Sequence, residues 1–117
     1  MHVLIIEDDL LVALDVVDSL SVLEHCTTSL ASTEELAVRA VVNRRPDLIV
    51  ADLCLAEGRG PDAVRRITET LGEIPVLYVT GHTDDTEVHQ LDAEILFKPV
   101  ERDALIDWCK RMVNFRI

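Results

Sequence analysis

Apolar residues along this chain follow two patterns, short runs and longer stretches at helical spacing. The short runs have the length of strands. Three of them are apolar nearly throughout, which predicts strands covered on both faces of a sheet. CTTSLAS is more polar, so we expect it near a sheet edge. In chain order the five predicted strands are HVLII, CTTSLAS, DLIVAD, IPVLYVT and AEILF.

Two helices are predicted in the first half of the chain. The first lies in LLVALDVVDSLSVLE, and its inward face is expected to carry Leu10, Ala13, Val17 and Leu20. The second begins at a cap formed by Ser32 or Thr33. It is expected to run to about Arg45, because Pro46 disfavours helical backbone before it.

Two further helices are predicted in the second half, with a shorter fourth helix between them. PDAVRRITETL opens with Pro61 and stops at Gly72, with an apolar face of Val64, Ile67 and Leu71. The polar stretch GHTDDTEVHQLD has room for one or two helical turns. The last helix lies in ERDALIDWCKRMVNF, where the apolar face consists of Leu105, Trp108, Cys109 and Met112.

Strand and helix therefore alternate about five times, without an internal repeat or a linker. Because crossovers between parallel strands are right-handed, this order predicts an α/β fold with a doubly wound parallel sheet and helices on both faces. The length of 117 residues suits one domain spanning 1–117. Since Ile117 follows the last helix directly, we expect a stand-alone domain without an output domain.

Composition narrows the function classes. The net charge of −11 argues against nucleic acid as a ligand, since phosphate backbones attract Lys and Arg. The sequence has no membrane-length apolar run and no targeting signal, which predicts a cytoplasmic protein. Cys26, Cys54 and Cys109 are odd in number and far apart, so reduced thiols are expected rather than disulfides or a zinc site. We expect His2, His25 and His89 at the surface.

Charged residues stand where three predicted strands end, and a hydroxyl residue stands at the end of a fourth. Glu7 and Asp8 follow the first strand, Asp52 ends the third, Thr80 the fourth, and Lys98 follows the fifth. In a doubly wound sheet these carboxyl ends face the ligand crevice. Crowded carboxylates repel unless a cation neutralises them, and oxygen ligands favour Mg²⁺ or Mn²⁺ over zinc. Magnesium retains room for a phosphate oxygen, so the pattern predicts phosphate chemistry.

Four segments in this order, LIIEDD, DLIVADLCL, PVLYVTG and ILFKP, resemble the signatures of bacterial response-regulator receiver domains. The resemblance covers the whole chain. It implies a flavodoxin-like sheet with strand order 2-1-3-4-5. It also implies that Asp52 is a phosphoacceptor, which takes its phosphoryl group from a histidine kinase or a histidine phosphotransfer protein. Such a domain catalyses its own phosphorylation and dephosphorylation, and is not an enzyme in the usual sense.

The resemblance also implies roles for the neighbouring residues. Asp8 would bind Mg²⁺ directly, Glu7 mostly through water, and Cys54 through its backbone carbonyl. Asp9 would instead be the cap or a first-turn acid of the following helix. Thr80 would hydrogen-bond the phosphoryl group and Lys98 would pair with its charge. The Lys98–Pro99 peptide bond would be cis. Gly81 and His82 lie where the family tunes phosphoryl lifetime.

Two features depart from the family pattern. Thr80 and Lys98 are closer in sequence than usual, so we expect the fourth helix to be short or irregular. The usual switch aromatic is replaced by Ile95, which puts the usual output mechanism in doubt. If a homodimer forms, the first helix is the candidate interface, because LLVALDVV is more apolar than one core face needs; Val12 and Val16 are the positions to test.

Output would then be binding to another protein, or the domain would serve as a phosphate sink or relay. Two alternatives remain at this point. One is a degenerate receiver that only binds partners, although the intact acidic set argues against it. The other is a Mg²⁺-dependent aspartyl-phosphate phosphatase, which needs a second acid where this chain has Cys54.

Overall fold

The structure is a computed structural model that describes residues 1–81 and 93–115. Five parallel strands form one sheet in the order β2-β1-β3-β4-β5, as predicted. The strands are β1 (His2–Ile6), β2 (Thr27–Ala31), β3 (Leu48–Asp52), β4 (Val76–Thr80) and β5 (Glu94–Phe97). The helices of the described residues are α1 (Leu10–Leu20), α2 (Glu34–Asn43), α3 (Gly60–Leu71) and α4 (Arg102–Phe115).

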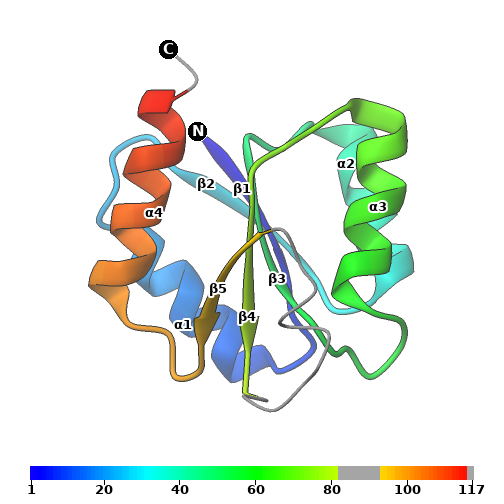
Figure 1. The fold of residues 1–117 in the computed structure, drawn as a ribbon, viewed down its shortest axis with the longest axis horizontal. Helices are drawn as coiled ribbons and strands as arrows, with labels where there is room; N and C mark the ends of the chain where they lie inside the picture. The colour runs from blue at the N-terminus through cyan, green and yellow to red at the C-terminus, as the bar shows by residue number, and fades with distance from the viewer. Residues whose placement is uncertain (82–92, 116–117) are drawn as a thin grey trace.

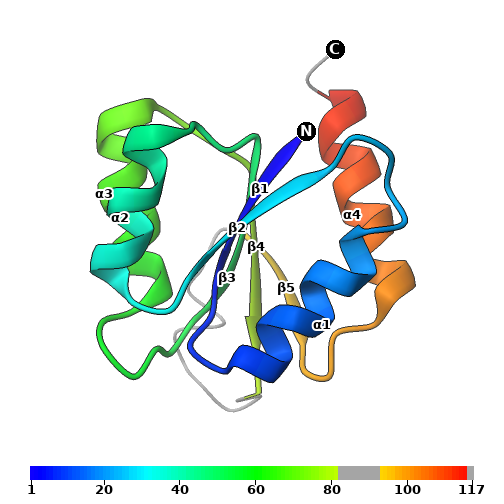
Figure 2. The ribbon, with the colours of Figure 1, turned by 180° about the vertical axis from the view of Figure 1, so that it is seen from behind.

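The sheet lies between two helical layers (Figures 1 and 2). Helices α1 and α4 cover one face, and α2 and α3 cover the other. Alternate residues of the central strands point to opposite layers, which explains why β1 and β3 are buried throughout. The predicted short or irregular fourth helix falls in 82–92, outside the described residues, as do His82 and His89.

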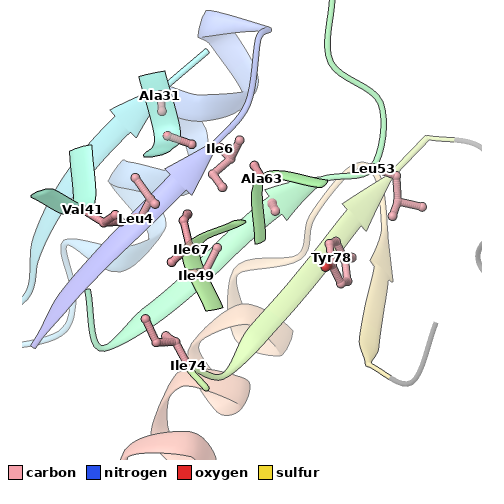
Figure 3. Packing of buried hydrophobic residues seen from close by; sticks show 12 residues of the cluster. Leu4, Ile6, Ala31, Val41, Ile49, Leu53, Ala63, Ile67, Ile74 and Tyr78 are labelled. Atoms are coloured by element: carbon pink, nitrogen blue, oxygen red, sulfur yellow. The ribbon is translucent and has the colours of Figure 1, made fainter. Parts of the chain in front are cut away.

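The core on the α2–α3 side includes Leu4 and Ile6 of β1, Ile49 of β3 and Ile67 of α3 (Figure 3). The core on the α1–α4 side contains Trp108, which is 2% exposed, packed with Leu105 and Cys109. The apolar faces predicted for α3 and α4 are confirmed, since their members are buried or packed against these cores.

The helix starts follow local side-chain chemistry. Asp9 caps α1, because its carboxylate accepts hydrogen bonds from the backbone amides of Leu11 and Val12. Thr33, rather than Ser32, caps α2 through the amide of Leu36. Helix α2 ends at Asn43, two residues before the expected Arg45.

The inward face of α1 was predicted incorrectly in part. Leu10 is 63% exposed, because it begins the helix beyond the edge of the core, whereas Val16 is 3% exposed and packs inside. Val16 therefore cannot serve as the interface position proposed from the sequence. The large apolar side chains that α1 exposes are Leu10, Leu11 and Leu14.

The described part of the chain contains no helix with the length and apolarity needed to cross a membrane.

Strand register aligns the carboxyl ends of the central strands. Ile6 pairs with Ala51, Asp52 with Val79, and Thr80 with Phe97. The residues that follow β1 and β5 therefore lie beside Asp52, at one edge of the sheet.

Candidate functional site

An acidic cluster occupies this edge, as predicted. Carboxylate oxygens of Glu7, Asp8 and Asp52 lie within 4.8 Å of one another. Glu7 and Asp52 are 5% and 6% exposed, whereas Asp8 lies at the surface. Two buried acids at such a distance repel strongly when both are ionised.

The ammonium group of Lys98 contacts both buried acids. Its Nζ lies 2.7 Å from Glu7 Oε1 and donates a hydrogen bond of 2.9 Å to Asp52 Oδ2. The strand end holds it there, because the Lys98 amide donates to the Thr80 carbonyl at 2.8 Å. The Lys98–Pro99 peptide bond is cis, as the resemblance implied.

Burial changes the ionisation of this cluster. The pKa of Glu7 is raised to about 7. Desolvation is the main cause of the rise, and the contact with Lys98 lowers the pKa by less than desolvation raises it. Burial lowers the pKa of Lys98, but the contacts with Glu7 and Asp52 outweigh it, so that its pKa is raised overall. Lys98 therefore stays charged while Glu7 ionises reluctantly.

Backbone amides fix the carboxylates as well. The Asp9 amide donates to Glu7 Oε2 at 3.1 Å, and the Cys54 amide donates to Asp52 Oδ1 at 3.3 Å. The Ala56 amide donates to Asp8 Oδ2 at 2.8 Å. This last contact was not predicted, because a backbone amide leaves no signal in the side-chain sequence.

The residues fit a hard divalent cation. Three carboxylates supply only oxygen ligands, which suit Mg²⁺ or Mn²⁺. Among the described residues, Glu7 Oε1 is a buried side-chain atom whose contact with Lys98 lacks hydrogen-bond geometry. A buried carboxylate oxygen in that state has capacity for a further positive partner.

The remaining predicted residues lie around the cluster. Thr80 is completely buried at the end of β4, and Gly81 follows it at the surface. Cys54 is exposed two residues after Asp52, with a free thiol. Ile95 is half-buried in β5 and pairs with Tyr78, so no aromatic ring stands at that place.

Two glycines shape the loop after Asp52. A side chain at Gly60 would collide with the backbone carbonyl of Asp52, and Gly58 has a φ of +90°. The glycines of LAEGRG are typical of a loop, but they do not indicate this close approach to the site.

Comparisons with known proteins agree with this geometry. The model of the response regulator receiver domain matches residues 3–110. Over 85 residues the chain is 39% identical to the phyllosphere-induced regulator PhyR of Methylorubrum extorquens, covering 71% of this chain and 32% of PhyR. It is 31% identical over 81 residues to the regulatory protein LuxO of Vibrio cholerae, covering 66% of this chain and 18% of LuxO.

Solved structures show the same fold. The solution structure of the PhyR receiver domain of Erythrobacter litoralis superposes with a TM-score of 0.85 at 27% identity, covering 97% of this chain and 90% of that one. The chain spans about a third of PhyR and under a fifth of LuxO, both of which are longer regulators. The matched family model, together with the cluster at the sheet edge, shows that this chain belongs to the response regulator receiver domains.

Proposed function

We propose that this domain accepts a phosphoryl group on Asp52, in a reaction that requires Mg²⁺ or Mn²⁺. Phosphoacceptance is the general role of the family. The observation that carries the proposal is the placement of Asp52, which is nearly buried beside two further carboxylates and hydrogen-bonded to Lys98 at 2.9 Å.

The chemistry follows from these neighbours. A carboxylate oxygen of Asp52 attacks phosphorus, the P–N bond of the phosphohistidine breaks, and the leaving imidazole takes up a proton. A cation held by Asp8, Glu7 through water, Asp52 and the Cys54 carbonyl would neutralise the charge on the phosphoryl oxygens. Lys98 is placed to transfer its contact from Asp52 to a phosphoryl oxygen, so one positive charge stays at the reacting group.

Thr80 is proposed to hydrogen-bond the phosphoryl group. Because it is completely buried, its hydroxyl would meet that group only after a local change at the end of β4. Gly81 leaves open space next to it, since a side chain there would meet no atom within 4 Å. The role of His82 in phosphoryl lifetime remains a prediction.

Intact mass after incubation with acetyl phosphate tests the proposal. We expect a gain of one phosphoryl group that depends on Mg²⁺ and is absent in Asp52→Asn. Asp62→Asn is the matched control, because it removes a partly exposed acid from the first turn of α3 and should leave the gain unchanged. No gain in the wild type would favour a receiver that only binds partners.

The phosphodonor is proposed to be a histidine kinase or a histidine phosphotransfer protein. A groove beside the site runs along α1 and is lined in part by Leu11, Leu14 and Lys98. Leu11 and Leu14 are 79% and 47% exposed. Because Lys98 contacts Asp52 directly, a protein seated in this groove would bring its phosphohistidine to the acceptor.

A substitution on α1 separates protein donors from small ones. We expect Leu14→Arg to slow transfer from a phosphohistidine protein at least tenfold, and to leave phosphorylation by acetyl phosphate unchanged. Val42→Arg is the control, because Val42 is 81% exposed on α2, on the opposite face of the sheet. Equal slowing with both donors would show that Leu14→Arg impairs phosphoryl transfer itself rather than binding of the donor protein.

The domain would not need a separate output domain for this role. It would signal by binding another protein, or it would act as a phosphate sink or relay. It also places the domain in the cytoplasm, where the free thiols of its three cysteines would stay reduced. Phosphatase chemistry has less support, since the exposed Cys54 stands where an acid is needed.

A further inference from the structure

The loop that follows Asp52 contacts the acidic cluster in its middle and where it meets α3. Its middle contacts the cluster through the Ala56 amide, which donates to Asp8 Oδ2 at 2.8 Å. Gly60, the first residue of α3, lies against the Asp52 carbonyl, and its amide donates to the Leu53 carbonyl at 3.2 Å. The two ends of the loop are therefore joined by hydrogen bonding.

The same loop is fixed to the first turn of α2. The Glu34 amide donates to the Glu57 carbonyl at 3.3 Å. Gly58 follows with a φ of +90°, and a Cβ atom there would lie 2.6 Å from the Cβ of Glu34. Real Cβ atoms do not approach so closely, so this packing requires glycine.

We propose that Gly58 is a positioning residue for the cation site. By letting the loop lie against Glu34, it keeps the Ala56 amide on Asp8 and so fixes the orientation of that exposed carboxylate. The inference rests on the proposed function, because the cation concerned is the one that phosphoryl transfer requires.

The physical reason is preorganisation. A surface aspartate rotates freely unless a partner holds it, and a ligand that must first be ordered binds a metal more weakly. The amide occupies one oxygen of Asp8, which leaves the other oxygen for a cation. Loss of groups that orient metal ligands typically weakens metal affinity by about 10-fold or more.

The chain offers a matched control. Gly72 has a φ of +83°, close to that of Gly58, but a side chain there would meet no atom within 4 Å. Gly58→Ala and Gly72→Ala therefore both place a side chain at a positive φ. Only Gly58→Ala also forces the loop away from Glu34.

The experiment measures two quantities in wild type, Gly58→Ala and Gly72→Ala. One is the dissociation constant for Mg²⁺, by calorimetry. The other is hydrogen exchange of the Ala56 amide without cation, by NMR. We expect Gly58→Ala to weaken Mg²⁺ binding about 10-fold and to speed the exchange, with both quantities unchanged in Gly72→Ala. Adding Glu34→Gly to Gly58→Ala removes the colliding Cβ and should restore both.

An unchanged Mg²⁺ affinity in a folded Gly58→Ala protein would overturn the proposal. If that variant does not fold, hydrogen exchange in the wild type tests the proposal. A wild-type Ala56 amide that exchanges as fast as a free amide would also overturn the proposal. Absence of Mg²⁺ binding in the wild type would instead contradict the proposed function. The exchange of Ala56, measured without cation, would still report on the role of Gly58.

Discussion

The two ends of β1 both bury polar side chains, but they satisfy them differently. At the amino end, His2 is 5% exposed, and its ring nitrogens each lie 2.8 Å from a hydroxyl, of Thr27 and Ser29. At the carboxyl end, Glu7 is also 5% exposed, but it shares a single ammonium group, that of Lys98, with Asp52.

The comparison separates a structural cluster from a functional one. A neutral imidazole has one donor and one acceptor, and two hydroxyls satisfy both without net charge. Three carboxylates facing one ammonium leave excess negative charge, which works against folding in the absence of a cation. An arrangement that costs stability and lies at a ligand-binding edge is typical of a functional site.

Removing the shared ammonium should have the largest effect. Lys98→Met leaves Glu7 and Asp52 facing each other unpaired, so we expect the free energy of unfolding without Mg²⁺ to fall by about 2–3 kcal/mol near pH 8. This is below the usual loss for a buried pair, because the Lys98 side chain is 22% exposed. Urea titration with and without Mg²⁺ measures it, and Mg²⁺ should recover part of the loss.

Arg102→Met is the matched control. Arg102 pairs with Asp18 at 2.6 Å, but both side chains are about half exposed or more. Exposed pairs contribute little, so a change within about 0.5 kcal/mol is expected. Equal losses in the two variants would mean that the carboxyl end carries no special electrostatic strain.

A substitution at the amino end of β1 should lower the free energy of unfolding by less than Lys98→Met does. His2→Ala removes both hydroxyl contacts of the ring and leaves a small cavity, so we expect a loss of about 1–2 kcal/mol in unfolding free energy. Mg²⁺ should not alter that loss, since His2 lies at the opposite end of β1 from the acids. A loss that shrinks when Mg²⁺ is added would show that the two ends are coupled.

His2 also shows what the sequence could not predict. It was expected at the surface, but it is 5% exposed. Its burial depends on Thr27 and Ser29, which the register of β1 with β2 brings onto the same face. Single-residue patterns do not contain such cross-strand partners. In contrast, the acids after β1 and β3 were predictable, because parallel strands bring their carboxyl ends together whatever the register details.

The loop glycines mark a second limit. The glycines of LAEGRG are typical of a loop, but the contact of Gly58 with Glu34 joins segments that only the folded chain brings together. The same holds for α1, where an apolar stretch predicted a helix but not which leucines stay outside. Local propensity gives the elements, whereas exposure and close approach depend on packing.

Low pH should reduce the contribution of His2, at the amino end of β1, to the free energy of unfolding. Burial, followed by the nearby charge of Arg44, lowers the pKa of His2 below 6.5, with Asp47 opposing and the N-terminal ammonium adding to the shift. Because the unfolded state then binds the proton more readily, the contribution of His2 is complete above pH 6.5 and is lost as pH falls through the lower, folded pKa.

The difference in unfolding free energy between wild type and His2→Ala isolates this contribution. We expect the difference to shrink between about pH 7.5 and about pH 5, as measured by urea titration at each pH. A difference that stays constant, or grows as pH falls, would contradict a neutral His2 in the folded protein.

Alkylation of Cys54, near the carboxyl end of β3, should change the free energy of unfolding least and still slow phosphorylation. Cys54 is exposed, whereas Cys109 is 1% exposed and burial raises its pKa to about 12, so iodoacetamide should modify Cys54 first. An exposed site tolerates the adduct within about 0.5 kcal/mol. Because the Cys54 amide donates to Asp52, we expect phosphorylation by acetyl phosphate to slow. Cys54→Ser should resist the reagent and keep its rate, and alkylated wild type that reacts at full speed would show that this thiol lies clear of the phosphoryl path.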